Sequence, residues 1–324
     1  MTNNAFNFEF DGAIGGPEMY FQDIDTSNTV NGKPMYYFID QNNQTVPADA
    51  GYVALINCTN FNVANLDLQQ NAHGVQLAFS TNCTITDCNF SNNNFGLFIY
   101  ESTNNTIYHN NFINNTFQVG NMYSWYGSVT LPPNTWNKAY PNSGNFWSNR
   151  SLSGSFNGAY QNETGSDGIA DAPYTIDVNN QDNYPLIAPI TGFDAGTWNG
   201  TPCSVHVVSN STLSEFSLNE TEKTIRFNVT GENGLGFCRV TVPNIIVQNL
   251  WQNNYAVLVD NQPPVEMRNW TDIENTYVYF TYQHSEHQIT IIPENLSLTL
   301  LTVVLTFAAA TATLPKRGRR KLSA

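Results

Sequence analysis

An aspartate and a histidine one repeat apart are the residues of this chain whose types and spacing best suit catalysis. Asp87 and His109 are separated by 22 residues, and Asn65 lies 22 residues before Asp87. If the chain stacks in coils of that length, the three side chains form one column, and the acid and the imidazole could share a proton or a metal ion. The alternative is a surface Asp–His pair without function.

A second group of oxygen ligands lies in the segment NETGSDGIADAPYTIDVNNQD. Glu163, Asp167 and Asp171 surround Gly168 in a pattern similar to that of calcium-binding loops. The pattern is degenerate, because Gly165 replaces one ligand and no Glu closes the loop. The segment therefore predicts either a calcium site that makes the loop rigid or an acidic Asx-turn.

Aromatic residues gather between positions 123 and 147. Trp125, Trp136, Tyr140 and Trp147 are the candidates for ligand binding among them, because flat rings beside Asn amides suit the faces and hydroxyls of neutral sugars. The same rings could instead cap the open end of a stack of coils.

The predicted coils lack the residues that two classes of polysaccharide enzyme use for catalysis. Polyuronate lyases use Lys or Arg to neutralise a substrate carboxylate, and neither occurs between Lys33 and Lys138. Hydrolases need paired carboxylates, but Asp67, Asp87 and Glu101 fall in three different columns of a 22-residue repeat. We therefore predict surface binding as the function and keep a polysaccharide-acting enzyme as the alternative.

Three consecutive blocks of 22 residues predict the elements that would position these side chains. The blocks start at Val53, Val75 and Leu97 and align without a gap. Apolar residues recur in columns, and short alternating runs between Asn clusters exclude helices. The repeat therefore predicts a parallel β-helix over residues 20–190.

Two columns of asparagine mark the predicted corners of the coils. Asn tolerates the left-handed backbone of a sharp corner, and its amide can bond to the amide one coil above. The predicted ladders are Asn60, Asn82 and Asn104, and Asn71, Asn93 and Asn115.

These coils, with the flanks NTWNKAYPNSGNFWSN and DNYPLIAPI, resemble a known family. They are similar to the right-handed parallel β-helix repeats (PbH1 repeats) of archaeal cell-surface proteins and of the NosD-like copper-maturation family, whose relatives include carbohydrate-binding and sugar-hydrolysing proteins. The resemblance implies a NosD-like copper-maturation factor as a further alternative. The five histidines, at 73, 109, 206, 284 and 287, are not expected to cluster into a copper site.

Longer alternating strands after Pro189 predict a β-sandwich over residues 191–294. The segment resembles a membrane-proximal module that follows β-helices in archaeal surface proteins, which implies a stalk. Five cysteines leave at least one thiol unpaired, and Cys203 with Cys238 could form a disulfide.

The last 30 residues predict a membrane anchor. Residues 296–314 carry no charge and are long enough to span a bilayer, and the basic tail at 316–324 follows. Because basic residues stay on the cytoplasmic side, the bulk of the chain is expected outside the cell. We assign the transmembrane helix to 295–315.

Charge and sequons agree with an exterior location. The tail holds five of the 12 basic residues, leaving seven against all 26 acidic ones, which argues against nucleic acid. Fourteen Asn-x-Ser/Thr sequons lie outside the tail. The N-terminal segment, residues 1–19, contains no signal peptide, so we expect this segment to be truncated and the true N-terminus to be missing.

The sequence therefore predicts an all-β protein: a right-handed parallel β-helix, a small β-sandwich and a C-terminal transmembrane helix. We expect a single-pass, glycosylated cell-surface protein that binds neutral glycans or other surface proteins, or serves as a structural part of an archaeal envelope. Calcium is the one cofactor that the residues suggest.

Overall fold

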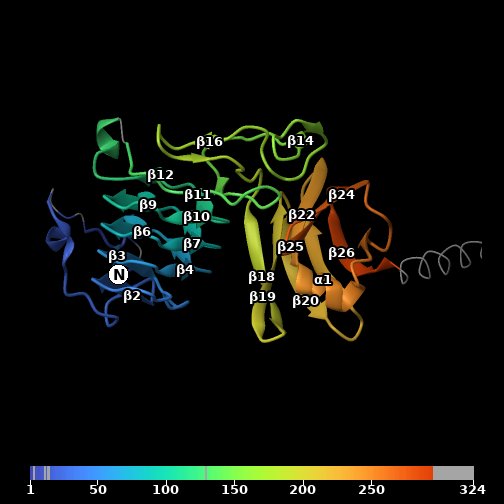
Figure 1. The fold of residues 1–324 in the computed structure, drawn as a ribbon, viewed down its shortest axis with the longest axis horizontal. Helices are drawn as coiled ribbons and strands as arrows, with labels where there is room; N and C mark the ends of the chain where they lie inside the picture. Colours follow the sequence, from blue (N-terminus) through green and yellow to red (C-terminus); the bar gives the residue numbers. More distant parts are fainter. Residues whose placement is uncertain (3, 11, 13–14, 128–129, 295–324) are drawn as a thin grey trace, which may run out of the picture.

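The computed structural model describes residues 1–2, 4–10, 12, 15–127 and 130–294, which form two bodies of β-structure side by side (Figure 1). Stacked coils and their covering loops come first in the chain, and long antiparallel strands follow from Ile190. No helix within those ranges is long and apolar enough to cross a membrane. The predicted span at 296–314 and the basic tail at 316–324 lie outside the described residues.

Three parallel sheets form the walls of the coils, apart from one antiparallel strand at an edge. The six-stranded sheet has the order β1 (Thr29–Val30), β2 (Lys33–Ile39), β3 (Tyr52–Ile56), β6 (His73–Ala78), β9 (Phe95–Tyr100) and β12 (Phe117–Gly120). The three-stranded sheet contains β4 (Asn62–Ala64), β7 (Thr84–Thr86) and β10 (Thr106–Tyr108). The four-stranded sheet contains β5 (Asp67–Gln69), β8 (Asn89–Ser91), β11 (Asn111–Ile113) and β13 (Phe146–Trp147).

The register of these sheets is the predicted 22-residue repeat. Val53 pairs with Val75, and Val75 pairs with Leu97. Like side chains therefore lie above like, and the columns fill one interior that includes Ile85 and Phe112. The predicted parallel β-helix is confirmed over these three coils.

The corners of the coils adopt the left-handed conformation. Asn60, Asn82 and Asn104 have φ values of 58°, 55° and 57° and are exposed. Asn reaches this region at lower cost than most residues, which explains this column without any bond between its amides.

The second asparagine column forms a ladder of a different kind from the predicted one. The Oδ1 of Asn93 accepts the backbone N–H of Asn71 at 2.9 Å, and the Oδ1 of Asn115 accepts that of Asn93 at 2.9 Å. Each side chain thus bonds to backbone one coil below rather than to the side-chain amide of the next asparagine in the column. The expectation of an amide-to-amide ladder is wrong here, because the turn leaves a buried N–H that the side-chain oxygen satisfies.

A further ladder of the same kind extends beyond the regular coils into the covering loops. Asn110 Oδ1 accepts the Cys88 N–H at 3.0 Å, Asn145 Oδ1 accepts the Asn110 N–H at 3.1 Å, and Asp182 Oδ2 accepts the Asn145 N–H at 2.7 Å. The loops therefore continue the stack in irregular form. They contain the short pairs β14 (Phe156–Asn157) with β15 (Glu163–Thr164) and β16 (Tyr174–Thr175) with β17 (Gln181–Asp182), and the 3-10 helix η2 (Ser124–Tyr126).

Asp182, at the top of this ladder, makes stability depend on pH. Burial raises its pKa to about 7, although hydrogen bonds from Asn145 and Trp147 oppose the rise. Because the folded pKa lies above the unfolded one, the stabilisation by Asp182 is complete below about pH 4 and is lost as the pH rises through about 7. We expect Asp182→Asn to remove this part of the slope, measured as free energy of unfolding in urea across that range.

A matched control for this experiment is Asp25→Asn. Asp25 is an exposed carboxylate whose pKa is lowered by a hydrogen bond from Ser27, so it titrates below the tested range. Parallel pH curves for the wild type and Asp182→Asn would contradict the prediction.

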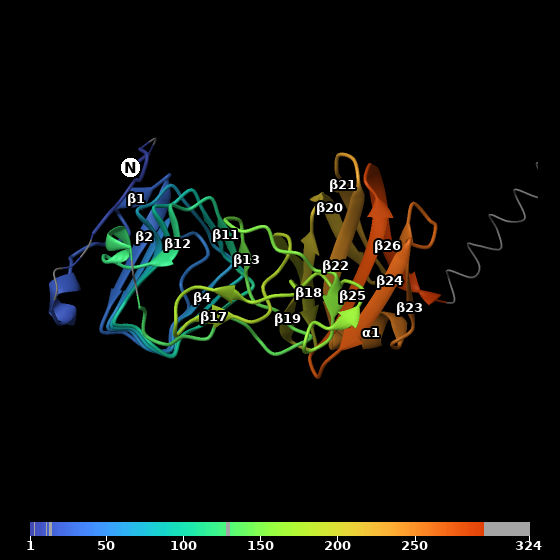
Figure 2. The same ribbon diagram turned by 90° about the horizontal axis from the view of Figure 1, so that it is seen from above.

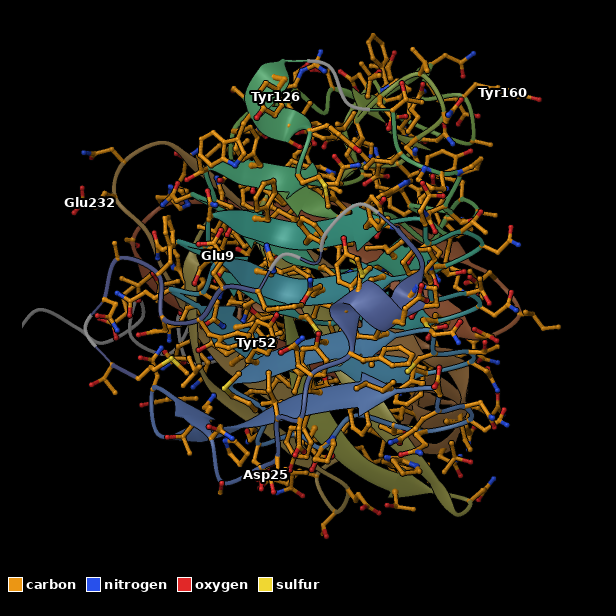
Figure 3. The ribbon with its side chains drawn as sticks, turned by 90° about the vertical axis from the view of Figure 1, so that its left-hand side faces the viewer. Glu9, Asp25, Tyr52, Tyr126, Tyr160 and Glu232 are labelled. Atoms are coloured by element: carbon orange, nitrogen blue, oxygen red, sulfur yellow. The ribbon has the colours of Figure 1, made fainter. Side chains whose placement is uncertain are left out.

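The N-terminal segment covers the outer face of the six-stranded sheet. Phe8 packs edge-on against Tyr52 with ring centroids 4.8 Å apart, and the backbone oxygen of Phe10 accepts a bond from Gln76 Nε2 at 2.8 Å. Tyr20, at the end of the 3-10 helix η1 (Pro17–Tyr20), is fully buried. In Figure 3, Tyr52 lies in the sheet behind this segment and Tyr126 lies at the top of the stack.

Two antiparallel sheets form the second body and share one apolar core. One has the order β18 (Ile190–Trp198), β19 (Thr201–Ser209), β22 (Leu235–Pro243), β25 (Asn275–Gln283) and β24 (Glu266–Thr271). The other has the order β20 (Thr212–Asn219), β21 (Thr224–Thr230), β26 (Glu286–Pro293) and β23 (Tyr255–Val259). Figure 2 shows β18 and β19 on the side that faces the coils.

Two details of the second body differ from expectation. A helix, α1 (Asn244–Trp251), follows β22 and packs Ile246 and Leu250 into the core. Cys203 and Cys238 are free thiols. The suggested disulfide is wrong because the register of β19 and β22 sets Cys238 opposite Ser209.

Candidate functional site

A groove of about 490 Å³ lies between the four-stranded wall of the coils and the start of β18. Its coil side is lined by two columns of polar residues and its far side by residues 189–192. The polar columns are Asn65, Asp87 and His109, and Asp67, Asn89 and Asn111. The stacked repeat thus aligns carboxylates, amides and an imidazole along one surface.

The first column owes its residue types partly to the backbone. Asn65, Asp87 and His109 have φ values of 59°, 56° and 56°, and Asn, Asp and His are the side chains most often found in this region. The column is therefore a row of corners that point polar groups away from the coil interior.

Asp87 is paired with a histidine from the second body. Its Oδ1 lies 2.9 Å from Nε2 of His206 on β19, and its Oδ2 accepts the Thr86 hydroxyl at 3.0 Å. Burial acts to raise the pKa of Asp87, but the hydrogen bond and charge of His206, with a smaller effect from His109, lower it overall. Asp87 is therefore an anion at neutral pH.

His109 is buried beside this pair and is neutral. Its ring centroid lies 5.6 Å from that of His206. Burial lowers the pKa of His109 to about 4, since the opposing effect of Asp87 is smaller. The structure thus brings the predicted Asp87 and His109 together and adds His206.

The expectation that the histidines stay apart is wrong for His109 and His206. Val205 and Val207 face the core of the second body, so alternation along β19 turns His206 outward, toward the coils. The alternation was visible in the sequence. The surface that His206 faces could not be predicted from the sequence, because it depends on how the two bodies pack.

Hydrogen bonds between Asn111 and Ile190 join the two sides of the groove. Asn111 Nδ2 donates to the Ile190 backbone oxygen at 2.7 Å, and the Ile190 N–H donates to Asn111 Oδ1 at 2.9 Å. Asn111 Nδ2 also donates to Asn89 Oδ1 at 2.6 Å. Asn111 is buried, whereas Asn89 and Asp67 are exposed, so the latter two are accessible to a ligand.

Residues 28–152 match the family model described as periplasmic copper-binding protein (NosD). The coil-forming part of the chain is NosD-like. The match starts just before β1 and ends just after β13, so it includes the coil wall of the groove but not the second body. No curated protein and no solved structure matches the chain.

Copper does not fit the side chains of the NosD-like coils. Cys58, Cys83 and Cys88 are buried, and burial raises the pKa of Cys83 to about 11 and that of Cys88 to about 12. A cysteine binds a metal ion as the thiolate, and these raised pKa values disfavour that form. In the part of the chain that the structure describes, no three His, Cys, Asp or Glu side chains form a metal-binding group. We therefore derive no function through copper.

The three predicted calcium ligands do not converge. Asp167 is buried and accepts bonds from Gln161 Nε2 at 3.0 Å and the Ile169 N–H at 2.9 Å. Asp171 accepts the backbone N–H groups of Ser155 and Phe156, and Glu163 is exposed on β15. The carboxylates of Asp167 and Asp171 hold turns of the loop instead, which corrects the calcium prediction in favour of the acidic turn.

The predicted aromatic binding residues divide by burial. Trp136 is 1% exposed and Trp147 is 0% exposed, so neither ring can offer a face to a sugar. Trp147 stacks between Phe112 and Tyr174 at centroid distances of 4.4 and 4.2 Å. These two rings cap the coil interior, which corrects their assignment as ligand contacts.

The other two aromatic candidates are not sealed in the cap. Trp125, in η2, is 60% exposed and packs edge-on against Phe117 at 4.7 Å. Tyr140 is half-buried, and its hydroxyl accepts the Gly158 N–H at 3.2 Å. Neither lines the groove, so the two lie apart from the strongest candidate site.

Proposed function

We propose that this chain is an extracellular, NosD-like β-helix protein that binds uncharged glycans in the groove between the coils and β18. The observation that carries the proposal is the lining of the groove. Amides, carboxylates, hydroxyls and an imidazole lie beside apolar side chains such as Ile113 and Ile190, and no Lys or Arg is among the lining residues.

This lining suits the chemistry of neutral sugars. Carboxylates accept bonds from sugar hydroxyls, amides both donate and accept, and apolar side chains pack against the C–H faces of the ring. Asp67 and Asp87 would repel an acidic polysaccharide. The groove therefore favours neutral over anionic glycans.

An exterior location is part of the same proposal. The NosD-like segment matches a family described as periplasmic, and the sequence predicts a membrane span at 296–314. We propose that this span anchors the chain with its bulk outside the cell, so that extraction of the full chain should require detergent.

We expect Asp67→Asn to weaken binding of a neutral oligosaccharide by about ten- to a hundredfold, the usual range for a hydrogen bond to a charged group. Asp67 is exposed, and Gln69 Nε2 donates to its Oδ2 at 3.2 Å, so the fold should tolerate the change. The full chain, in a detergent without a sugar headgroup, would first be screened on a glycan array. The best neutral hit would then be titrated calorimetrically.

The matched control is Glu101→Gln, which removes one exposed carboxylate from a coil corner outside the groove. It should leave the affinity unchanged. Equal losses in the two variants, or an array that detects only anionic glycans, would contradict the proposal.

A polysaccharide hydrolase is the second candidate, because Asp67 and Asp87 line the same groove. The lowered pKa of Asp87 suits a base, not the acid that must protonate a leaving group. Release of reducing ends in the same screen, abolished by Asp87→Asn or His109→Asn, would favour the enzyme. Binding without products favours the proposal.

A further inference from the structure

A second hollow, of about 380 Å³, lies on the second body between α1 and the edge strand β24. It is lined by Gln248 and Asn253 from the helix end, by Tyr255, and by Asn269 and Thr271 from the edge strand. None of the described residues that line it carries a charge. The hollow therefore has the neutral polar character of the groove but lies on a different body.

Bonds between the lining side chains hold their polar groups in place. Asn253 Nδ2 donates to Gln248 Oε1 at 2.7 Å, and Asn269 Nδ2 donates to the Tyr255 hydroxyl oxygen at 3.2 Å. Because the Tyr255 oxygen accepts this bond, its own hydrogen can be donated to a ligand. The Gln248 amide nitrogen and the oxygens of Asn253 and Asn269 offer further donors and acceptors.

The Tyr255 ring supplies an apolar surface among these groups. It is partly buried, and its centroid lies 5.5 Å from that of Trp251. A fixed aromatic ring beside neutral amides suits the C–H face and the hydroxyls of a sugar.

We propose that this hollow holds a sugar residue. The sugar could be a separate glycan or the first residue of a glycan attached to the chain, since Asn269, Trp270 and Thr271 form a sequon and both Asn269 and Thr271 are exposed. An attached glycan would also shield the outer edge of β24 from pairing with another sheet. The proposal does not depend on the groove.

Hydrogen exchange of the full chain distinguishes the two sources. Chain from a host without N-glycosylation is incubated with N-acetylglucosamine or with mannose. At a sugar concentration ten times the Kd, binding should slow amide hydrogen exchange in residues 248–255 and 266–271 about tenfold, because the bound protein opens locally less often. Chain from a glycosylating host is examined by mass spectrometry for a glycan on Asn269, and enzymatic removal of that glycan should speed exchange in the same peptides.

Two variants and one control make the test specific. Gln248→Ala and Tyr255→Phe each remove a donor and should abolish the sugar-dependent protection, while Tyr160→Phe, which changes a tyrosine that is 86% exposed and outside the hollow, should not. Asp67→Asn should also leave this protection intact, so failure of the groove proposal would be seen separately. Sugar-dependent protection in either preparation supports the proposal, and its absence from both overturns it.

Discussion

Replacing Arg239 with alanine should lower the free energy of unfolding by about 3–5 kcal/mol, the cost of breaking a buried charged contact. Arg239, on β22, is 1% exposed. Its Nη1 donates to the Asp167 backbone oxygen at 2.7 Å, its Nη2 donates to the Pro141 oxygen, and its guanidinium lies 4.8 Å from the Tyr277 ring centroid. Without it, the covering loops lose these two hydrogen bonds to the second body. Urea unfolding and small-angle scattering would measure the loss and any separation of the bodies.

The pH dependence of this variant provides a second readout. Burial raises the pKa of Asp167, and the charge of Arg239 opposes the rise. In Arg239→Ala the opposition is gone, so the folded pKa of Asp167 should rise further and the variant should lose more stability as the pH increases. Adding Asp167→Asn should reduce that slope.

Arg226→Ala is the matched control. Arg226 pairs with Glu222 at 2.8 Å, and the side chains are 40% and 52% exposed, so its loss should cost at most about 1 kcal/mol. Similar losses in the two variants would show that Arg239 contributes no more than a surface arginine.

The coil structure was predictable because each repeat independently indicates the same period and register. Val53, Val75 and Leu97 occupy one position in successive blocks, and a slip of one residue would turn every apolar side chain outward. Apolar columns and Asn corners therefore fixed the length and the register of the coils. The same logic found Asp87 and His109, since both belong to a column.

The packing between the two bodies was not predictable in the same way. His206 and Arg239 lie on strands whose alternation is ordinary, and their partners, Asp87 and Asp167, are distant in the sequence. The covering loops were also obscure, because Asn145 and Asp182 continue a ladder at irregular spacing. Contacts that no period repeats leave little trace in a single sequence.

Asn110 shows how strongly the ladders should contribute to stability. It is fully buried; its Oδ1 accepts the Cys88 N–H at 3.0 Å, and its Nδ2 donates to the Ile85 oxygen at 2.9 Å. We expect Asn110→Ala to cost about 3–5 kcal/mol, because each buried group left without a partner costs about 1–3 kcal/mol. Urea unfolding of the purified variant measures this directly.

Asn82 tests whether the cost comes from the ladder or from the turn. It is an exposed corner with φ of 55°, so Asn82→Ala should cost only about 1–2 kcal/mol of backbone strain and Asn82→Gly much less. If Asn110→Ala were no worse than Asn82→Ala, the corner conformation would account for both asparagine types. A larger loss at Asn110 means that side-chain bonds to the coil below, repeated through Asn145 and Asp182, hold the stack together beneath the groove.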